Sequence, residues 1–167
     1  NRIKDGKFEK KDNVYELNKN EDGNHLHGGE KGFHTAIWNS EKLSAENYVG
    51  IKFTYFSKDG EQGYPGNLDA TVIYKLYEGK LLISYMAETD KITPVNFTNH
   101  SYFNLSGKVG TDILDHQLLI NADEFLPVNK EKIPFGEYKD VDSTPLDFTS
   151  EKRIGEDINK LPEQGYD

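Results

Sequence analysis

The chain has 167 residues, which is enough for one sizeable hydrophobic core and predicts a single domain. Its 29 acidic and 20 basic side chains give a formal net charge of −9, which argues against a nucleic-acid partner. No apolar run approaches the roughly 18 residues of a membrane-spanning helix, so we expect no membrane partner. Because there is no Cys, a disulfide framework and a thiolate metal site are excluded, and we expect a cytoplasmic protein.

The middle of the chain predicts an antiparallel meander of three strands. Residues 49–55 alternate between apolar and other side chains, the period of a half-buried strand. A turn-rich connection, 57–67, leads to a second strand with its apolar face over 70–76. The short turn 78–79 then leads to a third strand with its apolar face over 81–87.

Strand character also dominates the rest of the chain. We expect a strand that begins at Pro94, since proline donates no hydrogen bond to a ladder and belongs at a strand's start. Residues 116–122 predict a further strand, and 141–150 a proline-containing loop. Only 151–161 has a helix-like spacing of apolar residues, and it is weak. Tyr and Phe supply most of the aromatic 12% of residues, so the chain is predicted to be all-β.

A histidine pair stands in the segment GNHLHGGEKGFH, residues 23–34. In an extended strand His25 and His27 would project to the same face, and neutral imidazoles are good ligands for divalent transition metals. The spacing is similar to the His-x-His of cupins, but Glu30 comes too early for the cupin acidic ligand. Alternatively, one histidine faces a ligand while Gly28 and Gly29 allow close backbone approach. A surface loop with hydrogen-bonded histidines is an equally open interpretation.

The segment TPVNFTNHSYFNLSG, residues 93–107, mixes aromatic residues with amides and an imidazole. In the expected strand Asn96, Thr98 and His100 share one face, which is unlike a core face. Such a row suits a cleft that binds hydroxyl groups. If the segment stood alone, the exposed polar face of an edge strand would be the favoured explanation.

Two further features favour plain structural roles on residue type. The segment DGEQGYPGN, residues 59–67, is rich in glycine and proline, which favour turns for backbone reasons. A binding loop is the alternative. Trp38, the single Trp, could stack on a sugar ring, but a packing role is the stronger expectation.

Taken together, several motifs in this order resemble the aldose 1-epimerase (galactose mutarotase) family, and the resemblance runs through essentially the whole chain. They are NRI at the start, LHGGEKGF at 26–33, SKDGEQGYPGNL at 57–68, TPVNFTNHSYFNLSG at 93–107, TPLDF at 144–148 and the terminal GYD. The resemblance implies a large antiparallel β-sandwich, galactose mutarotase-like and incomplete in this chain. It also implies interconversion of the α and β anomers of hexoses such as glucose and galactose, with no cofactor and no metal.

The same resemblance assigns roles to individual residues. It implies that His100 is the proton donor to the ring oxygen, and imidazole titrates near neutral pH, as such a role requires. It implies that His27 stabilises the developing charge and positions the sugar. The other residues expected to bind the aldohexose are Asn1, Arg2, Ser101, Tyr102 and Asp167.

One departure from the family pattern matters. The family's general base is a Glu beyond the GYD motif, and no residue up to Asp167 matches it. We therefore expect residues 1–167 to be one mutarotase-like domain truncated at both ends, and inactive alone. A non-catalytic sugar-binding relative, a hexose-6-phosphate epimerase of related fold and a cupin-like metalloprotein are the alternatives. The sequence does not indicate an oligomeric state.

Overall fold

The computed structural model describes residues 1–161, which fall into two compact units, Asn1–Thr98 and residues 99–161. Every strand pair among the described residues is antiparallel, and the helices there are three short 3-10 turns. The predicted all-β, antiparallel class is therefore confirmed. A single domain over residues 1–167 stays a prediction.

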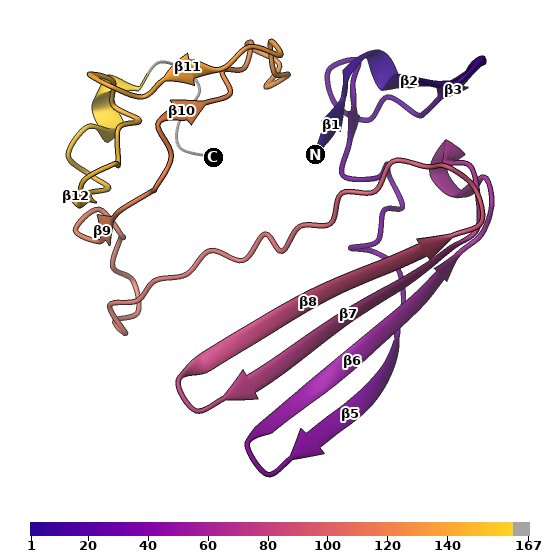
Figure 1. Ribbon diagram of the computed structural model, residues 1–167, viewed down its shortest axis with the longest axis horizontal. Coiled ribbons are helices and arrows are strands. Elements are labelled where there is room, and N and C mark those ends of the chain that lie inside the picture. The colour runs from indigo at the N-terminus through magenta and orange to yellow at the C-terminus, as the bar shows by residue number, and fades with distance from the viewer. Residues whose placement is uncertain (162–167) are drawn as a thin grey trace. The chain divides into compact units, whose positions relative to one another are not determined.

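The main sheet of the first unit is a meander of four strands in chain order (Figure 1). It contains β5 (Asn39–Ala45), β6 (Tyr48–Ser57), β7 (Leu68–Tyr77) and β8 (Lys80–Thr89). The last three are the strands expected from the alternating pattern. Strand β5 was not expected, because six of its seven residues are exposed and it shows no apolar alternation.

The register of the sheet puts the alternating apolar residues in rows on one face. Tyr55 pairs with Ala70, and Val49 pairs with Leu76 six residues away at the other end. The face is buried near the loop that joins β6 to β7, where Ala70 is 1% exposed. At the opposite end Val49 remains 60% exposed and Leu76 54%. The core of this unit therefore lies at the loop end of the sheet.

Aromatic rings cover that end of the sheet. Phe33 packs edge-on against Trp38 and Tyr55, with ring centroids 5.8 and 5.3 Å apart. Phe97 contacts both Phe33, at 5.8 Å, and Tyr85 of β8, at 6.0 Å. The indole nitrogen of Trp38 donates to the carbonyl of Phe33 at 2.9 Å. Trp38 thus has a packing role within a cluster that ties the residues after His27 to the sheet.

Short elements precede the sheet. In chain order they are β1 (Arg2–Ile3), η1 (Lys4–Gly6), β2 (Lys7–Lys10), β3 (Asn13–Glu16) and β4 (His25–Leu26). Strands β2 and β3 form a hairpin, and β1 pairs with β4. The pairing of β1 with β4 brings the NRI motif beside the histidine pair.

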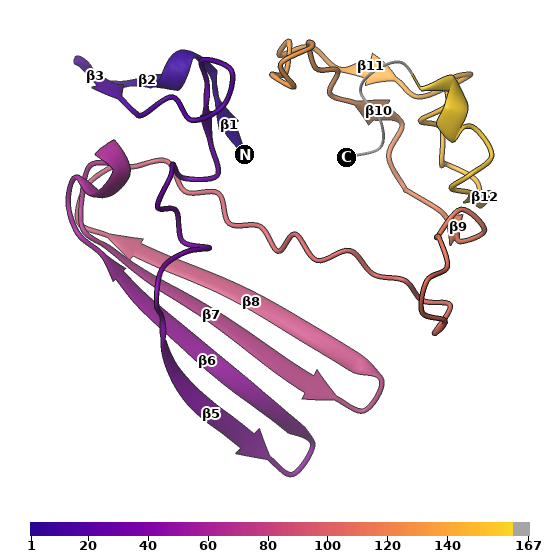
Figure 2. The ribbon, with the colours of Figure 1, turned by 180° about the vertical axis from the view of Figure 1, so that it is seen from behind.

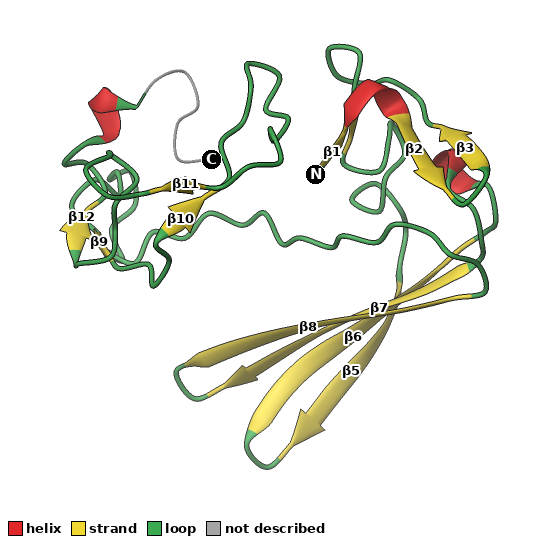
Figure 3. Ribbon diagram, turned by 45° about the horizontal axis from the view of Figure 1, so that its top comes forward, coloured by secondary structure: helices red, strands yellow, loops and turns green. Residues whose placement is uncertain are grey.

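The described part of the second unit is mostly loop (Figure 3), with two small antiparallel strand pairs. Strand β9 (Gln117–Leu118) pairs with β12 (Lys152–Arg153), and β10 (Glu124–Phe125) pairs with β11 (Lys139–Asp140). The strand expected over residues 116–122 is therefore only two residues long. Among residues 99–161 the last element is a 3-10 turn, η3 (Ile158–Lys160), and the buried residues there include Ile133, Val141 and Phe148.

The strand expected from Pro94 is wrong. The segment after β8 runs extended but is assigned no strand before β9 (Figure 2). Two of its amides bond their own backbone instead: Oδ1 of Asn99 accepts from the nitrogen of Ser101, and Oδ1 of Asn104 from that of Ser106, each at 3.0 Å. Such local bonds compete with a strand ladder.

The weak helix-like spacing over residues 151–161 corresponds to no α-helix, and the helical turn in this range is the short 3-10 turn η3. The main-chain nitrogens of Ile154 and Gly155 donate to the carbonyls of His116 and Leu114, at 2.9 and 2.8 Å. These two nitrogens therefore bond carbonyls of the segment before β9 and are not available for a helical turn. The weak apolar spacing reflected a chain lying along β9.

Candidate functional site

Strands β1 and β4 place Asn1 directly beside His27. Arg2 pairs with Leu26 in the ladder, and the main-chain nitrogen of His27 donates to the carbonyl of Asn1 at 3.0 Å. The main-chain nitrogen of Asn1 lies 3.3 Å from Nδ1 of the His27 ring. Residues 26 positions apart in sequence are thus brought together by two hydrogen-bonded contacts.

The Arg2 guanidinium is held in a fixed orientation by Glu21. Its Nε donates to Oε2 at 2.5 Å and its Nη2 to Oε1 at 2.9 Å, a bidentate pair in which both side chains are half-buried. Planar pairs of this kind restrict the orientation of the guanidinium. Glu21 therefore fixes the orientation of the Arg2 guanidinium through Nε and Nη2, and the third nitrogen, Nη1, is not part of this pair.

His27 occupies a tight turn rather than a strand. The nitrogen of Gly29 donates to the carbonyl of Leu26 at 2.9 Å, and the two residues between them, His27 and Gly28, have φ of +52° and +79°. Positive φ at both central positions is the signature of a type I′ turn. Histidine adopts this conformation more readily than most residues, but glycine, asparagine and aspartate lead there. The His27 side chain is exposed at the tip.

The expected shared face of His25 and His27 is wrong, because the left-handed turn takes His27 out of the strand. His25 is 1% exposed, and its Nδ1 lies 2.8 Å from the carbonyl of Asn18. Its ring packs edge-on against Tyr64 at 5.5 Å. Burial raises the pKa of the Tyr64 hydroxyl to about 12. His25 is therefore part of the packing beneath the turn, and only His27 points outward.

The loop DGEQGYPGN, which joins β6 to β7, is held in a turn by hydrogen bonds of its own residues and of Lys91. It contains η2 (Glu61–Gly63). One carboxylate oxygen of Asp59 accepts from the nitrogen of Gly66 at 2.6 Å, and the other pairs with Lys91 at 2.5 Å. These bonds hold the pKa of Asp59 below its usual range, with the Lys91 contact the larger cause. The turn interpretation therefore describes this loop well.

A contact from Asn1 reaches the start of the 93–107 segment. Its Nδ2 donates to the carbonyl of Asn96 at 2.7 Å. The Asn1 side chain thus bonds the main chain of a segment that also carries Phe97 of the aromatic cluster. Within the first unit, the residues expected to bind the sugar are brought together as Asn1, Arg2 and His27.

The remaining expected site residues lie in the second unit. The rings of His100 and Tyr102 lie 5.0 Å apart at an interplanar angle of 50°. The nitrogen of Ser101, between them, donates to Oδ1 of Asn99. All three expected residues are exposed. Asp167 lies outside the described residues.

The chemistry that these side chains offer is hydrogen bonding and proton transfer. Among residues 1–161, no three His, Asp or Glu side chains are grouped so that they could hold a metal ion. In the same range no helix is long and apolar enough to cross a membrane. Imidazole, guanidinium, amide and hydroxyl groups on strand ends and turns suit a polar ligand rich in hydroxyls.

A model of the family described as aldose 1-epimerase matches residues 1–167, the entire chain. The chain belongs to the aldose 1-epimerase family. It is 42% identical to a galactose mutarotase from Bos taurus over 167 residues, which cover all of this chain and 48% of that protein. It is 40% identical to an aldose 1-epimerase from Escherichia coli, again over all of this chain and 49% of that protein. The chain thus spans about half the length of the curated relatives it matches.

Solved structures of epimerases share this architecture. A galactose 1-epimerase from Lactobacillus acidophilus superposes with a TM-score of 0.87 and 33% identity, over 95% of this chain and 46% of that one. An aldose epimerase homologue from C. elegans superposes with a TM-score of 0.81 and 30% identity, over 92% and 46%. The galactose mutarotase-like fold that the sequence predicted is thereby confirmed.

Two residues that contact the segments of Arg2 and His27 were not expected from the sequence. Glu21 orients Arg2, and Gln62 contacts the turn that carries His27 through a hydrogen bond to the nitrogen of Lys31. Glu21 lies outside the NRI motif that it contacts, and Gln62 lies outside the LHGGEKGF motif that it contacts. Charged and amide side chains are also common in loops, so their residue types gave no signal. The only signal for Gln62 was its place in the DGEQGYPGN loop, which residue types alone assigned to turn formation.

Proposed function

We propose that this chain supplies the substrate-binding residues and the general acid of an aldose 1-epimerase that interconverts the α and β anomers of hexoses such as glucose and galactose. The observation that carries the proposal is the adjacency of Asn1, Arg2 and His27 in a chain that matches the family over its whole length. A polar, hydrogen-bonding group at strand ends fits a ligand with several hydroxyls.

The reaction requires two proton transfers on the sugar. A base removes the proton of the C1 hydroxyl, an acid protonates the ring oxygen, and the C1–O bond opens to give the aldehyde. Rotation about C1–C2 and reversal of both transfers close the ring with the other configuration. A positioned acid and base each contribute roughly 10²–10⁴-fold to such a step.

Two histidines take distinct parts in this scheme. His100 protonates the ring oxygen, and its exposed ring is compatible with access by a ligand. His27 positions the sugar and stabilises the charge that develops during opening. Its place at the tip of a left-handed turn supports this role, because non-glycine residues with positive φ cluster at functional sites.

Arg2, Asn1, Ser101, Tyr102 and Asp167 complete the proposed sugar-binding set. Arg2 suits hydroxyl recognition because Glu21 fixes its orientation before a ligand arrives. Binding is stronger when the recognising group is already ordered, since less side-chain entropy is then lost.

Anomerisation of freshly dissolved α-glucose and α-galactose, followed by polarimetry, tests the proposal in the full-length protein. We expect relaxation far faster than in buffer alone and proportional to protein concentration. A protein that binds aldoses without accelerating relaxation would instead be a sugar-binding relative, and the proposed activity would be wrong.

A further inference from the structure

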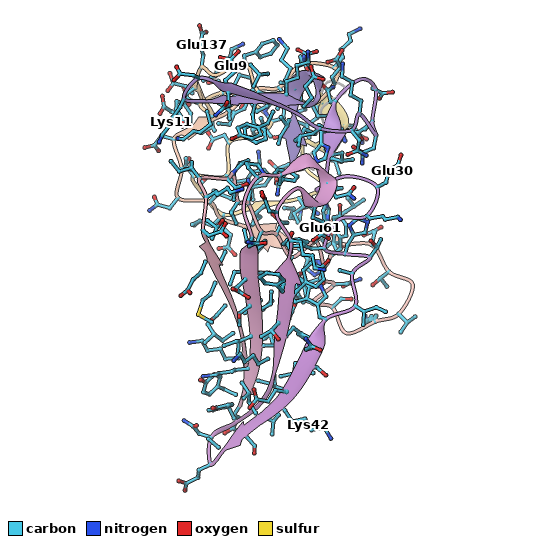
Figure 4. The ribbon with its side chains drawn as sticks, turned by 90° about the vertical axis from the view of Figure 1, so that its right-hand side faces the viewer. Glu9, Lys11, Glu30, Lys42, Glu61 and Glu137 are labelled. Atoms are coloured by element: carbon cyan, nitrogen blue, oxygen red, sulfur yellow. The ribbon has the colours of Figure 1, made fainter. Side chains whose placement is uncertain are left out.

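Gln62 reaches out of the loop between β6 and β7 and contacts the turn that carries His27. Its Oε1 accepts from the main-chain nitrogen of Lys31 at 3.2 Å. A Cβ added to Gly29 would lie 2.5 Å from the same oxygen, so the Gln62 amide rests directly against the Gly29 backbone. Figure 4 labels Glu30, which lies between Gly29 and Lys31 in sequence, and Glu61, which precedes Gln62. Both labels lie at the loop end of the sheet.

The loop holds Gln62 in an unfavourable backbone conformation. Its φ is +50°, in the left-handed region, where the Cβ of a residue with a side chain comes too close to the following carbonyl oxygen. The bond from the nitrogen of Gly60 to the carbonyl of Tyr64, at 2.8 Å, closes the loop around it. The hydroxyl of Tyr55 donates to Oε1 of the neighbouring Glu61 at 2.6 Å. Surrounding contacts therefore maintain a strained residue whose side chain is aimed at the His27 turn.

The His27 turn depends on support from outside itself. The bond from the nitrogen of Gly29 to the carbonyl of Leu26 closes the turn, and Asn1 contacts the nitrogen and the ring of His27 on one side. Gln62 contacts the other side at Gly29 and Lys31. Since Gly28 and Gly29 have no side chains to restrict them, the direction of the turn is set by the groups that pack against its backbone.

We propose that Gln62 is a positioning residue for the epimerase reaction, which acts by holding the Gly29–Lys31 backbone so that the His27 ring is presented in one orientation. This inference rests on the function proposed above. It gives the DGEQGYPGN loop a second role beside turn formation: a strained loop tip that fixes the geometry of a ligand-binding turn.

Gln62→Gly in the full-length protein removes the side chain while relieving the strain of a positive φ, so thermal stability should be unchanged or higher. We expect kcat/KM to fall about 10- to 100-fold, since small misplacements of a site group have effects of this size. Gln62→Glu keeps an acceptor oxygen at the same reach and should stay within about threefold of the wild type. Lys31→Ala is the matched control, because the contact uses only the main-chain nitrogen.

The nitrogen and carbon-bound proton resonances of the His27 ring provide a second readout that does not require turnover. Gln62→Gly should shift or broaden them, and Lys31→Ala should not.

If the wild type accelerates no anomerisation, the proposed function fails, but these resonances still decide whether Gln62 positions His27. Unchanged His27 resonances and unchanged kcat/KM in Gln62→Gly would overturn the inference. So would a Gln62→Glu variant as impaired as Gln62→Gly. Should Gln62→Gly not fold, Gln62→Asn, which tolerates positive φ but is too short to reach, replaces it.

Discussion

At the scale of single residues, His100 carries the most specific chemical expectation. His100→Asn keeps a polar side chain but cannot transfer a proton near neutral pH, so kcat should fall on the order of 10²–10⁴-fold while KM changes little. Polarimetric progress curves over a range of sugar concentrations separate the two constants. His34→Asn, an exposed histidine outside the proposed site, is the control. A His100→Asn enzyme with nearly normal kcat would remove His100 from the role of acid.

Gly32 shows how a residue without a side chain supports the His27 turn. A Cβ added there would lie 2.3 Å from the carbonyl oxygen of His27, and a main-chain atom cannot move aside cheaply. We expect Gly32→Ala to lower the free energy of unfolding by about 1–3 kcal/mol, the usual cost of overpacking, and to reduce activity with it.

Gly23→Ala is the natural comparison for Gly32→Ala. Gly23 has a φ of +83° but nothing within 4 Å of an added Cβ, so its substitution introduces backbone strain without a collision. Urea unfolding should show a loss of stability for both variants, whereas anomerisation should suffer only in Gly32→Ala. Equal activity of the two variants would mean that the turn accommodates the added methyl group.

At the scale of elements, the loop between β6 and β7 links stability to alkaline pH through Tyr64. Burial raises its pKa to about 12, above the ordinary value of 10.0. Below pH 10 the hydroxyl is protonated in both the folded and the unfolded states, so its ionisation does not lower the stability of the fold. As the pH rises from about 10 to 12, the unfolded state ionises first, so stability falls.

Tyr64→Phe removes this titration, and the variant should lose less thermal stability than the wild type over the same pH interval. The measurement is Tm by circular dichroism in alkaline buffers of constant ionic strength. Tyr138→Phe, at a tyrosine that is 70% exposed, should retain the steepness of the wild type. An identical decline in Tyr64→Phe would show that other groups control alkaline unfolding.

At the scale of the whole molecule, the sheet β5–β8 has an apolar face that residues 1–161 leave partly open. Val49 and Leu76 are more than half exposed, and Leu81, which pairs with Leu76, is 48% exposed. Open apolar faces and unpaired strand edges favour association. The curated relatives are about twice as long as this chain. We therefore expect residues 1–167 produced alone to be prone to association.

We predict negligible mutarotase activity for residues 1–167 produced alone. The family resemblance assigns the general base to a Glu that this chain does not match, and the lack of one positioned base costs on the order of 10²–10⁴ in rate. The assay is the anomerisation rate per folded molecule beside a full-length control. A rate equal to the control would place the base within residues 1–167.

The sequence alone determined the features that depend on local patterns. Alternating apolar residues predicted β6, β7 and β8 because a strand with one buried face must have period two, and Glu78 with Gly79 predicted the two-residue turn between the last two. Ordered motifs predicted the family and the residues expected to bind the sugar. Strand β5 was missed because its residues are exposed and its existence depends only on pairing with β6.

Only the tertiary structure decided which residues lie beside one another. Among residues 1–161 the extended segment after Pro94 has no strand partner. Residues 151–157 form no helical turn, because the main-chain nitrogens of Ile154 and Gly155 bond the chain near β9. His25 and His27, two residues apart, separate into a buried ring and an exposed one because a left-handed turn intervenes. Glu21 and Gln62 reach the site through long-range hydrogen bonds to other segments. Such contacts depend on the packing of distant segments, which no local periodicity encodes.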